Sequence, residues 1–370
     1  MKKSLVVLAV LAVSGTAMAQ SSVTLYGVVD AGFGVKKWTD AGVTVAKSSG
    51  VVDSITAGNR FGFRGTEDLG GGLKAEFVIE QGFSMTSQQL TNARTVSSGF
   101  QIDALTAAQG GGRSATSLNR QSYAGLLGNF GTVRIGYQYT NLYELATLSG
   151  YTLSTESLHG GDVAHLAQTY GGTRANGLTY ISPSFSGFTV RAQYGAGTNQ
   201  NTFESTTAGD TQLKENRASL MGQYANGPLS VAIAHTTYKN GTAVAPVAIT
   251  TLTNKVTQLG ASYDFGVAKL GGTYMKANNG GSGAAEVDTK GYQLGVSVPF
   301  GALAVIAAMG RSDVDTGVTR TRDAKTWQLG VNYNLSKRTQ MFAYTGSTKD
   351  SAVGGIDKKT NTVAGMRHSF

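Results

Sequence analysis

The sequence contains no cysteine, only 4 prolines and few charged residues, which make up 14% of its 370 residues. Without cysteine, the chain can form no disulfide framework and no thiolate metal site. No stretch after the N-terminus reaches the roughly 18 apolar residues that a membrane-spanning helix needs. The best candidate, Phe300–Met309, is bounded by Pro299 and Gly310. This segment is therefore interpreted as a strand.

Glycine is abundant, with 51 residues, and so are tyrosine and phenylalanine, with 16 and 14. Runs rich in glycine and in Tyr-Gly pairs are poor helix formers. Apolar residues account for 41%, a little low for a chain of this length with one buried core. The mixture favours many strands with one face against apolar surroundings and the other lined by small polar side chains.

The N-terminus has the three-part pattern of a secretory signal. Two lysines precede an apolar segment at 5–13, and a small-x-small cleavage motif ends at Ala19. We therefore predict a cleaved signal peptide over residues 1–19, since the apolar segment is too short for a transmembrane anchor. Residues 20–370 are expected to form one domain, with 29 basic and 22 acidic residues and a formal charge of +7.

The clearest repeated unit occurs in three copies that start 35 residues apart: TQLGASYDFG at 257–266, YQLGVSVPFG at 292–301 and WQLGVNYNLS at 327–336. Apolar or aromatic residues alternate in each copy with small or polar ones. A period of two places the two sets on opposite faces of a strand. A turn signal and a second strand follow each copy, so the repeat is predicted to be a β-hairpin.

Strands of this kind recur along the chain, and their connections alternate between short and long. We predict sixteen strands, seven short turns and eight long loops. An even number of strands, with short turns at one end and long loops at the other, is typical of transmembrane barrels. Short turns are predicted at 67–72, 128–131, 182–187, 226–228, 264–266, 299–301 and 334–338, and long loops near 35–52, 86–118, 140–175, 198–215, 240–254, 278–288, 313–324 and 349–358.

The predicted fold class is all-β, a closed 16-stranded antiparallel transmembrane barrel. In hydrocarbon every backbone polar group must be paired, so a sheet there has to close on itself. A soluble β-sandwich would show the same alternation. The signal peptide, the alternation of turns and loops, and aromatic residues near strand ends favour the barrel. These aromatic residues are Tyr137, Tyr139, Tyr194, Tyr224, Tyr263, Phe265 and Tyr333.

Several arginines occupy the polar side of neighbouring predicted strands or directly precede one: Arg60, Arg64, Arg134 and Arg120. We predict that they point into the lumen, where a guanidinium stays charged. A patch of one sign lets a pore favour ions of the opposite sign. Together with the formal charge of +7, this leads to the hypothesis of a weak preference for anions. The alternative is that these arginines are solvated charges paired with Glu76, Glu80 or Asp30.

Five segments resemble the general diffusion porins of the Gram-negative outer membrane, in that family's order and spacing: SSVTLYGVVDAG at 21–32, RFGFRGTEDLGGGLKAEFVIEQGF at 60–83, RQSYAGLLGNFGTVRIGYQYT at 120–140, NGLTYISPSFSGFTVRAQY at 176–194 and VAGMRHSF at 363–370. The resemblance implies a homotrimer in the outer membrane that conducts ions and small hydrophilic solutes by passive diffusion. It also implies contact with outer-membrane lipid, including lipopolysaccharide. Phe370, with His368 on the same face, would belong to the signal read by the barrel-assembly machinery.

The third long connection, 141–174, matches the position of the family's constriction loop, which folds back into the barrel. The resemblance places Arg60 and Arg120 in the basic wall facing this loop, with Arg134, Arg64 and Arg174 as further candidates. The acids of this connection are Glu144, Glu156 and Asp162. The family's usual Pro-Glu-Phe motif is replaced by Ser-Thr-Glu-Ser-Leu at 154–158, which leaves open which acid faces the pore.

Other functions fit the sequence less well. The four histidines, His159, His165, His235 and His368, form no recognisable nucleophile or metal motif, so no enzymatic activity, cofactor or metal is expected. Lysines and arginines are scattered rather than gathered in one stripe, which argues against nucleic-acid binding. A substrate-specific channel, or a barrel that acts as a surface receptor or adhesin, stays open as the alternative.

Overall fold

The computed structural model describes residues 22–86, 89–90, 120–149, 174–198, 211–244, 247–281, 286–351 and 357–370. The predicted signal peptide, 1–19, and two of the predicted loop acids, Glu156 and Asp162, lie outside these residues. Almost every described segment is a strand, and the described part contains one α-helix, α3 (Asn141–Ser149). Among the described segments, no helix has the length and apolar composition needed to cross a membrane.

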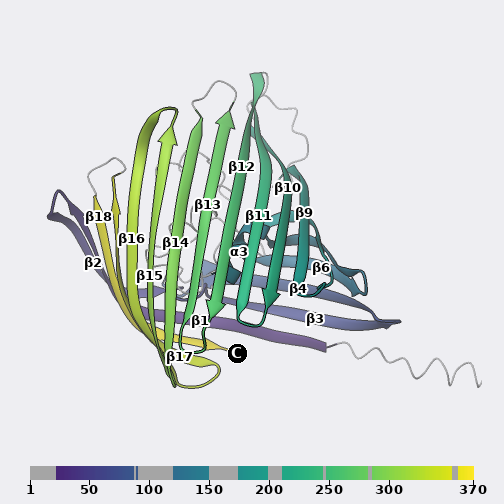
Figure 1. Cartoon of the computed structure of the whole chain (residues 1–370), viewed down its shortest axis with the longest axis horizontal. Coiled ribbons are helices and arrows are strands. Elements are labelled where there is room, and N and C mark those ends of the chain that lie inside the picture. Colours follow the sequence, from purple (N-terminus) through teal and green to yellow (C-terminus); the bar gives the residue numbers. More distant parts are fainter. Residues whose placement is uncertain are drawn as a thin grey trace, which may run out of the picture.

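The strands form one antiparallel sheet that closes on itself, because the first strand, β1, pairs with the last, β18 (Figure 1). Two of the eighteen strand segments add no separate wall strand. Segments β2 and β3 both pair with β1 and together form one interrupted strand, while β5 is a two-residue extension paired with β4. The wall therefore has sixteen strands, which confirms the predicted closed barrel.

The wall differs in height around the barrel. Strand β12 has 18 residues, whereas β6 and β8 have 8 each (Figure 1). About 9–11 residues of a tilted strand cross a bilayer, so β12 extends beyond it. The bounds are β1 Ser22–Asp40, β2 Val43–Asp53, β3 Arg60–Gly70, β4 Leu73–Ser84, β5 Gln89–Leu90, β6 Gln121–Gly128, β7 Gly131–Tyr139, β8 Arg174–Ile181, β9 Phe188–Thr198, β10 Thr211–Asn226, β11 Leu229–Val244, β12 Val247–Asp264, β13 Lys269–Gly281, β14 Val287–Phe300, β15 Leu303–Thr316, β16 Thr319–Asn334, β17 Thr339–Asp350 and β18 Lys358–Ser369.

The two faces of the sheet have opposite polarity. Large apolar side chains on one face are exposed: Ile135 is 65% exposed, Leu220 59% and Leu294 52%. Glutamines that alternate with such residues, including Gln193 and Gln328, are buried on the other face. An apolar exterior around a polar interior is the arrangement expected of a barrel in lipid.

Short turns join consecutive strands at one end of the barrel, at the seven places predicted. In the β12–β13 turn the Asp264 carboxylate accepts a hydrogen bond of 2.8 Å from the Gly266 amide, and Gly266 has a positive φ of 79°. This local bond fixes the turn, because only glycine adopts that φ without strain.

The prediction of a long loop at 35–52 is wrong. These residues form a hairpin in which β1 and β2 pair from Ala31 opposite Asp53 to Asp40 opposite Val43. The loop predicted at 313–324 is likewise mostly strand, with a tight turn at Gly317 (φ 60°) between β15 and β16. Beyond the lipid, both faces of a strand meet water, so the apolar alternation that marks a strand disappears there.

The interruption between β2 and β3 is organised by Asp30, which is fully buried. Its carboxylate accepts hydrogen bonds from the amides of Ile55 (3.0 Å), Thr56 (2.8 Å) and Ala57 (3.0 Å). The Ile55 side chain packs against Phe342 and neighbouring residues of β17 and β18. Asp30 thus holds residues 54–59 in place, rather than pairing with an arginine as the sequence alternative allowed.

Candidate functional site

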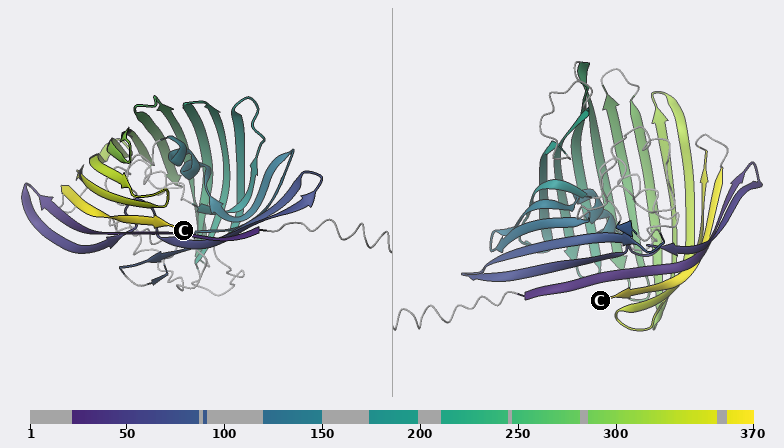
Figure 2. Two further views of the ribbon diagram at one scale, coloured as in Figure 1. Left: turned by 90° about the horizontal axis from the view of Figure 1, so that it is seen from below. Right: turned by 180° about the vertical axis from the view of Figure 1, so that it is seen from behind.

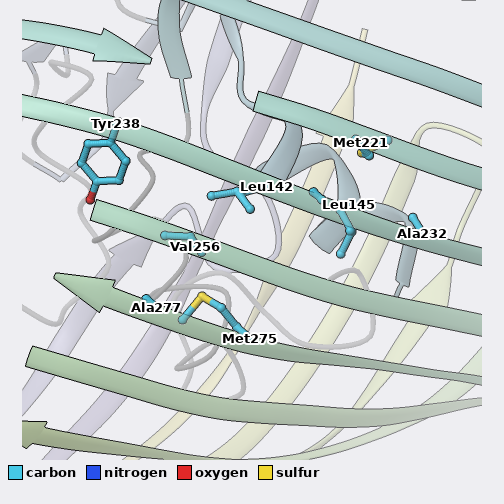
Figure 3. Close-up of a cluster of buried hydrophobic side chains, with 9 residues drawn as sticks. Leu142, Leu145, Met221, Ala232, Tyr238, Val256, Met275 and Ala277 are labelled. Carbon is cyan, nitrogen blue, oxygen red and sulfur yellow. The ribbon is translucent and has the colours of Figure 1, made fainter. Parts of the chain in front are cut away.

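Helix α3 follows directly on β7 and lies inside the barrel (Figure 2). Thr140 caps it, because its hydroxyl accepts a 3.3 Å hydrogen bond from the Tyr143 amide. Leu142 and Leu145, three residues apart and on one side of the helix, are fully buried. They pack against side chains of β10–β13: Met221, Ala232, Ala234, Tyr238, Val256, Met275 and Ala277 (Figure 3).

Polar contacts fasten both ends of the helix to the wall. The Asn141 side-chain amide donates a 3.0 Å hydrogen bond to the Ser219 hydroxyl, and the Ser262 hydroxyl donates a 3.1 Å bond to the Leu148 carbonyl. The connection after β7 therefore enters the lumen, as expected for a constriction loop. This holds for 141–149, since 150–173 lie outside the described residues.

The contact with α3 identifies the inner face of the sheet, and the register extends it around the wall. Ser219 faces the helix, and directly paired residues of antiparallel strands share a face. Alternate residues of one strand also share a face. The inner face of β4 therefore includes Glu76 and Glu80. The inner face of β3 includes Thr66, the register partner of Glu76, together with Arg64 and Arg60. The register runs from Ser219 to Glu76 by way of Gln193, Thr179, Arg134 and Gly125.

Glu80 is the centre of this inner wall, with its side chain only 4% exposed. Its carboxylate lies 2.7 Å from Nε of Arg120 and 3.5 Å from Nε of Arg60, and it accepts a 3.0 Å hydrogen bond from the Tyr26 hydroxyl. The structure thus brings Arg60 and Arg120 together, and it does so through pairing with Glu80, the alternative that the sequence left open.

Two further ion pairs continue the wall. Arg134 Nε lies 2.6 Å from Glu76, and its guanidinium sits 4.8 Å from the Tyr123 ring centroid. Arg191 of β9 lies 3.1 Å from Glu144, which α3 carries. Glu144, the one predicted loop acid within the described residues, is therefore engaged with a wall arginine.

The other arginines of this wall lie over tyrosine rings. The distance from the guanidinium to the ring centroid is 5.2 Å for Arg64 over Tyr26, 4.7 Å for Arg174 over Tyr139 and 5.1 Å for Arg217 over Tyr238. A guanidinium over a ring face is attracted by the ring quadrupole and remains charged. We call the following set the arginine cluster: Arg60, Arg64, Arg120, Arg134, Arg174, Arg191 and Arg217.

Tyr139 was expected in an interfacial aromatic girdle, and the structure corrects this. Its ring stacks on Tyr143 of α3 with centroids 4.5 Å apart, and its hydroxyl accepts hydrogen bonds from Arg120 (3.1 Å) and Arg174 (3.3 Å). Tyr139 ends β7 where the chain turns into the lumen, so its position in the alternation does not place it in the lipid.

Arg191 and Arg217 were not predicted as site residues. Each is buried and lies on the inner face, with Arg191 between Val190 and Ala192. The same alternation that identified Arg134 could have identified both. What the alternation could not show is that Arg191 meets α3, a contact between segments about fifty residues apart.

The chain ends at the seam of the barrel. The Phe370 amide and carbonyl each form a 3.1 Å hydrogen bond with the backbone of Gly27. His368 Nδ1 lies 2.9 Å from the Thr339 hydroxyl on the neighbouring strand. The last residues of the chain thus contact β1 on one side and β17 on the other.

A closed barrel with an apolar exterior, a charged interior and a segment folded into its lumen defines a β-barrel membrane channel. Residues 4–352 match the family of Gram-negative porins, and the chain belongs to this family. It is an outer-membrane porin, a channel for passive diffusion.

Two curated relatives match over the full length of both chains. The chain is 34% identical over 400 residues to outer membrane porin protein 32 of Delftia acidovorans, and 28% identical over 417 residues to an outer membrane porin protein of Bordetella pertussis. Among solved structures, the anion-selective porin from Comamonas acidovorans superimposes with a TM-score of 0.71 at 26% identity, covering 95% of this chain and 100% of that one.

Proposed function

We propose that this porin prefers anions and that the arginine cluster sets the preference. The observation that carries the proposal is the imbalance of charge at the inner wall beside α3. Among the described residues, four of the seven guanidiniums of the cluster are paired with three carboxylates, those of Glu76, Glu80 and Glu144, and the other three lie over tyrosine rings. Since Glu80 is shared by two arginines, the cluster keeps a positive excess that attracts anions to the lumen.

Similarity to a porin described as anion-selective supports the same sign of preference. In this proposal the basic wall is formed by Arg60, Arg120, Arg134, Arg64 and Arg174. The opposing side in this proposal is formed by the acids of the connection 141–174, which are Glu144, Glu156 and Asp162. The contact between Glu144 and Arg191 supports this arrangement for the first of the three acids.

The test is the reversal potential across a planar bilayer that separates two KCl concentrations. The wild type should show a chloride preference, and Arg60→Ala and Arg120→Ala should each reduce it because a positive charge leaves the inner wall. Arg338→Ala, in the exposed turn before β17, removes the same charge outside the lumen and should have no effect. A wild-type preference for potassium would contradict the proposal.

We also propose that the chain forms a homotrimer. The outward face of β3, β4, β6 and β7 supports this, because it exposes apolar residues such as Phe63 and Ile135 and, among the described residues, carries no lysine or arginine. Sedimentation of the detergent-solubilised protein should give three times the mass of one chain. A single-chain mass in a detergent that preserves conductance would contradict the trimer.

We propose, finally, that Phe370 and His368 form the signal recognised by the barrel-assembly machinery. The position of Phe370 at the seam supports this, because a receptor that holds the last strand would control closure. Contact with outer-membrane lipid follows from the location of the barrel.

A further inference from the structure

Residues 54–59 leave the plane of the wall between β2 and β3. Their partner strand, β1, pairs with Asp53 before the interruption and with Arg60 after it, and only two residues of β1 lie between these pairing positions. The six residues 54–59 are thus four more than the gap in the sheet accepts. The chain leaves the sheet at Ser54, whose φ of 56° lies in the left-handed region that residues other than glycine seldom adopt.

The segment turns into the lumen, where Ile55 is its apolar anchor. Ile55 is 1% exposed and packs against three buried side chains of β17 and β18: Phe342, Tyr344 and Val363. These belong to the inner face, because Tyr344 pairs with Gly330, which is two residues from the inner-face Gln328. Residues 54–59 therefore cover an apolar patch on the inside of the barrel.

Asp30 holds this segment by more than the three backbone amides that its carboxylate accepts. The same carboxylate accepts a hydrogen bond from the Thr56 hydroxyl. The Asp30 amide donates a 2.5 Å bond to Oδ1 of Asn59, and the Asp30 carbonyl accepts a 2.9 Å bond from the Ser54 amide. One residue of β1 thus fixes both ends and the middle of the segment.

Residues 54–59 and helix α3 lie on opposite sides of the lumen. Counted from β1 around the wall, with β2 and β3 as one strand and β5 left out, β10 is the eighth strand and β18 the sixteenth. They are half the circumference of a sixteen-stranded barrel apart. Helix α3 contacts β10 through Asn141, and Ile55 contacts β18 through Val363. The arginine cluster occupies the wall between these contacts, from Arg60 to Arg217.

A chain of contacts joins the two segments along this part of the wall. The Arg60 guanidinium donates a 3.1 Å hydrogen bond to the Gly58 carbonyl. From Arg60 the contacts described above continue to α3 by way of Glu80, Arg120, Tyr139 and Tyr143. The inner wall that carries the arginine cluster is therefore bounded by one infolded segment at each end.

We propose that residues 54–59 form a second constriction element of the pore, facing α3 across the lumen, and that Asp30 is the positioning residue that holds it there. The segment takes up space on the side of the lumen that α3 leaves open, so the two together set the largest solute that passes. This restriction acts on size, and it is independent of the charge of the solute.

Liposome swelling with the purified full-length porin and neutral sugars of increasing size tests this element. Deletion of residues 55–58 leaves two residues opposite the two of β1, so that the strand continues through the interruption. Because selectivity by size follows pore diameter, we expect entry of a trisaccharide, relative to that of a pentose, to rise at least about twofold. A folded deletion variant with the wild-type ratio would overturn the proposal.

A second measurement does not depend on folding of the deletion variant. The chain has no cysteine, so Ala57→Cys places a single thiol on the segment. A neutral methanethiosulfonate reagent adds bulk at this thiol and should lower the single-channel conductance. The control is Ser297→Cys, a half-buried position on the inner face of β14 near the short turns, four residues from Gln293. Full modification of Ala57→Cys without a fall in conductance, or with the same fall as in the control, would contradict a constriction at 54–59.

The role of Asp30 is tested by the same swelling ratio. Asp30→Ala should change the ratio in the direction of the deletion, and Asp30→Asn should change it less, because the amide oxygen still accepts hydrogen bonds. Asp40→Ala, in the same strand at the tip of the β1–β2 hairpin, is the control and should leave it unchanged. A wild-type ratio in Asp30→Ala would exclude Asp30 as the positioning residue. Neutral sugars carry no charge, so these results stand or fall separately from the proposed anion preference.

Discussion

At the scale of single residues, Glu80 has the largest influence on the inner wall. Its carboxylate contacts the guanidiniums of Arg60 and Arg120 and the hydroxyl of Tyr26. It therefore has two opposing effects on the pore. It holds two arginines in place, which stabilises the wall, and it cancels part of the positive charge on which the proposed anion preference depends.

Replacing this carboxylate by an amide should separate the two effects. Glu80→Gln should lower the free energy of unfolding by about 1–3 kcal/mol, because two arginines lose their charged acceptor. The loss should stay below that of a fully buried pair, since Arg60 is 24% and Arg120 12% exposed and water can partly replace the carboxylate. The reversal potential should move toward the chloride value, because the wall loses one negative charge and its net positive charge rises by one.

Glu67→Gln is the control for this substitution, because Glu67 lies exposed at the short-turn end of β3 and makes no ion pair within the described residues. Thermal unfolding and reversal potentials of the two variants should be measured under the same conditions. If Glu80→Gln behaves like Glu67→Gln in both, Glu80 neither holds the arginines nor offsets their charge.

At the scale of elements, the strands inside the lipid could be predicted because lipid imposes a strict alternation on them. Leu294 and Gln293 differ so strongly in polarity that the face of each is readable from the sequence. The same rule failed at 35–52, because a strand surrounded by water keeps its hydrogen bonds without an apolar face. In that hairpin Lys37 lies opposite Lys47. Such a charged composition is typical of a loop, although these residues form a sheet.

Two other elements depend on contacts that a local pattern does not contain. The helical segment α3 has only two fully buried leucines, and its position inside the barrel reflects Met221, Val256 and other residues of distant strands. The interruption at 54–59 depends on Asp30, more than twenty residues earlier, whose carboxylate replaces the missing strand partners. The resemblance to a family predicted the place of α3, whereas nothing predicted the role of Asp30.

At the scale of the whole molecule, the barrel exists only when β1 meets β18, its partner from the other end of the chain. The seam has twelve register pairs, from Val28 opposite Ser369 to Thr39 opposite Lys358, and the Gly27–Phe370 hydrogen bonds complete it. Contacts between the two ends of a chain cost the most loop entropy and form late in folding. Closure should therefore be sensitive to small changes at the seam that leave every other hairpin intact.

Gly27→Ala makes such a change. A Cβ atom at this position would lie 2.7 Å from the Arg60 carbonyl oxygen and would overlap the Phe370 ring, so the seam would have to shift. We expect a loss of about 1–3 kcal/mol, the usual cost of overpacking, and a smaller fraction of folded barrel after refolding into detergent micelles. Gly222→Ala in β10 is the control, because nothing lies within 4 Å of its added methyl group. Equal refolding of Gly27→Ala and Gly222→Ala would show that closure tolerates a displaced Phe370.

Deletion of Phe370 then tests the assembly signal. A protein that refolds in micelles as well as the wild type but fails to reach the outer membrane in cells would have lost recognition rather than closure. Normal outer-membrane levels after deletion of Phe370 would exclude it as the signal.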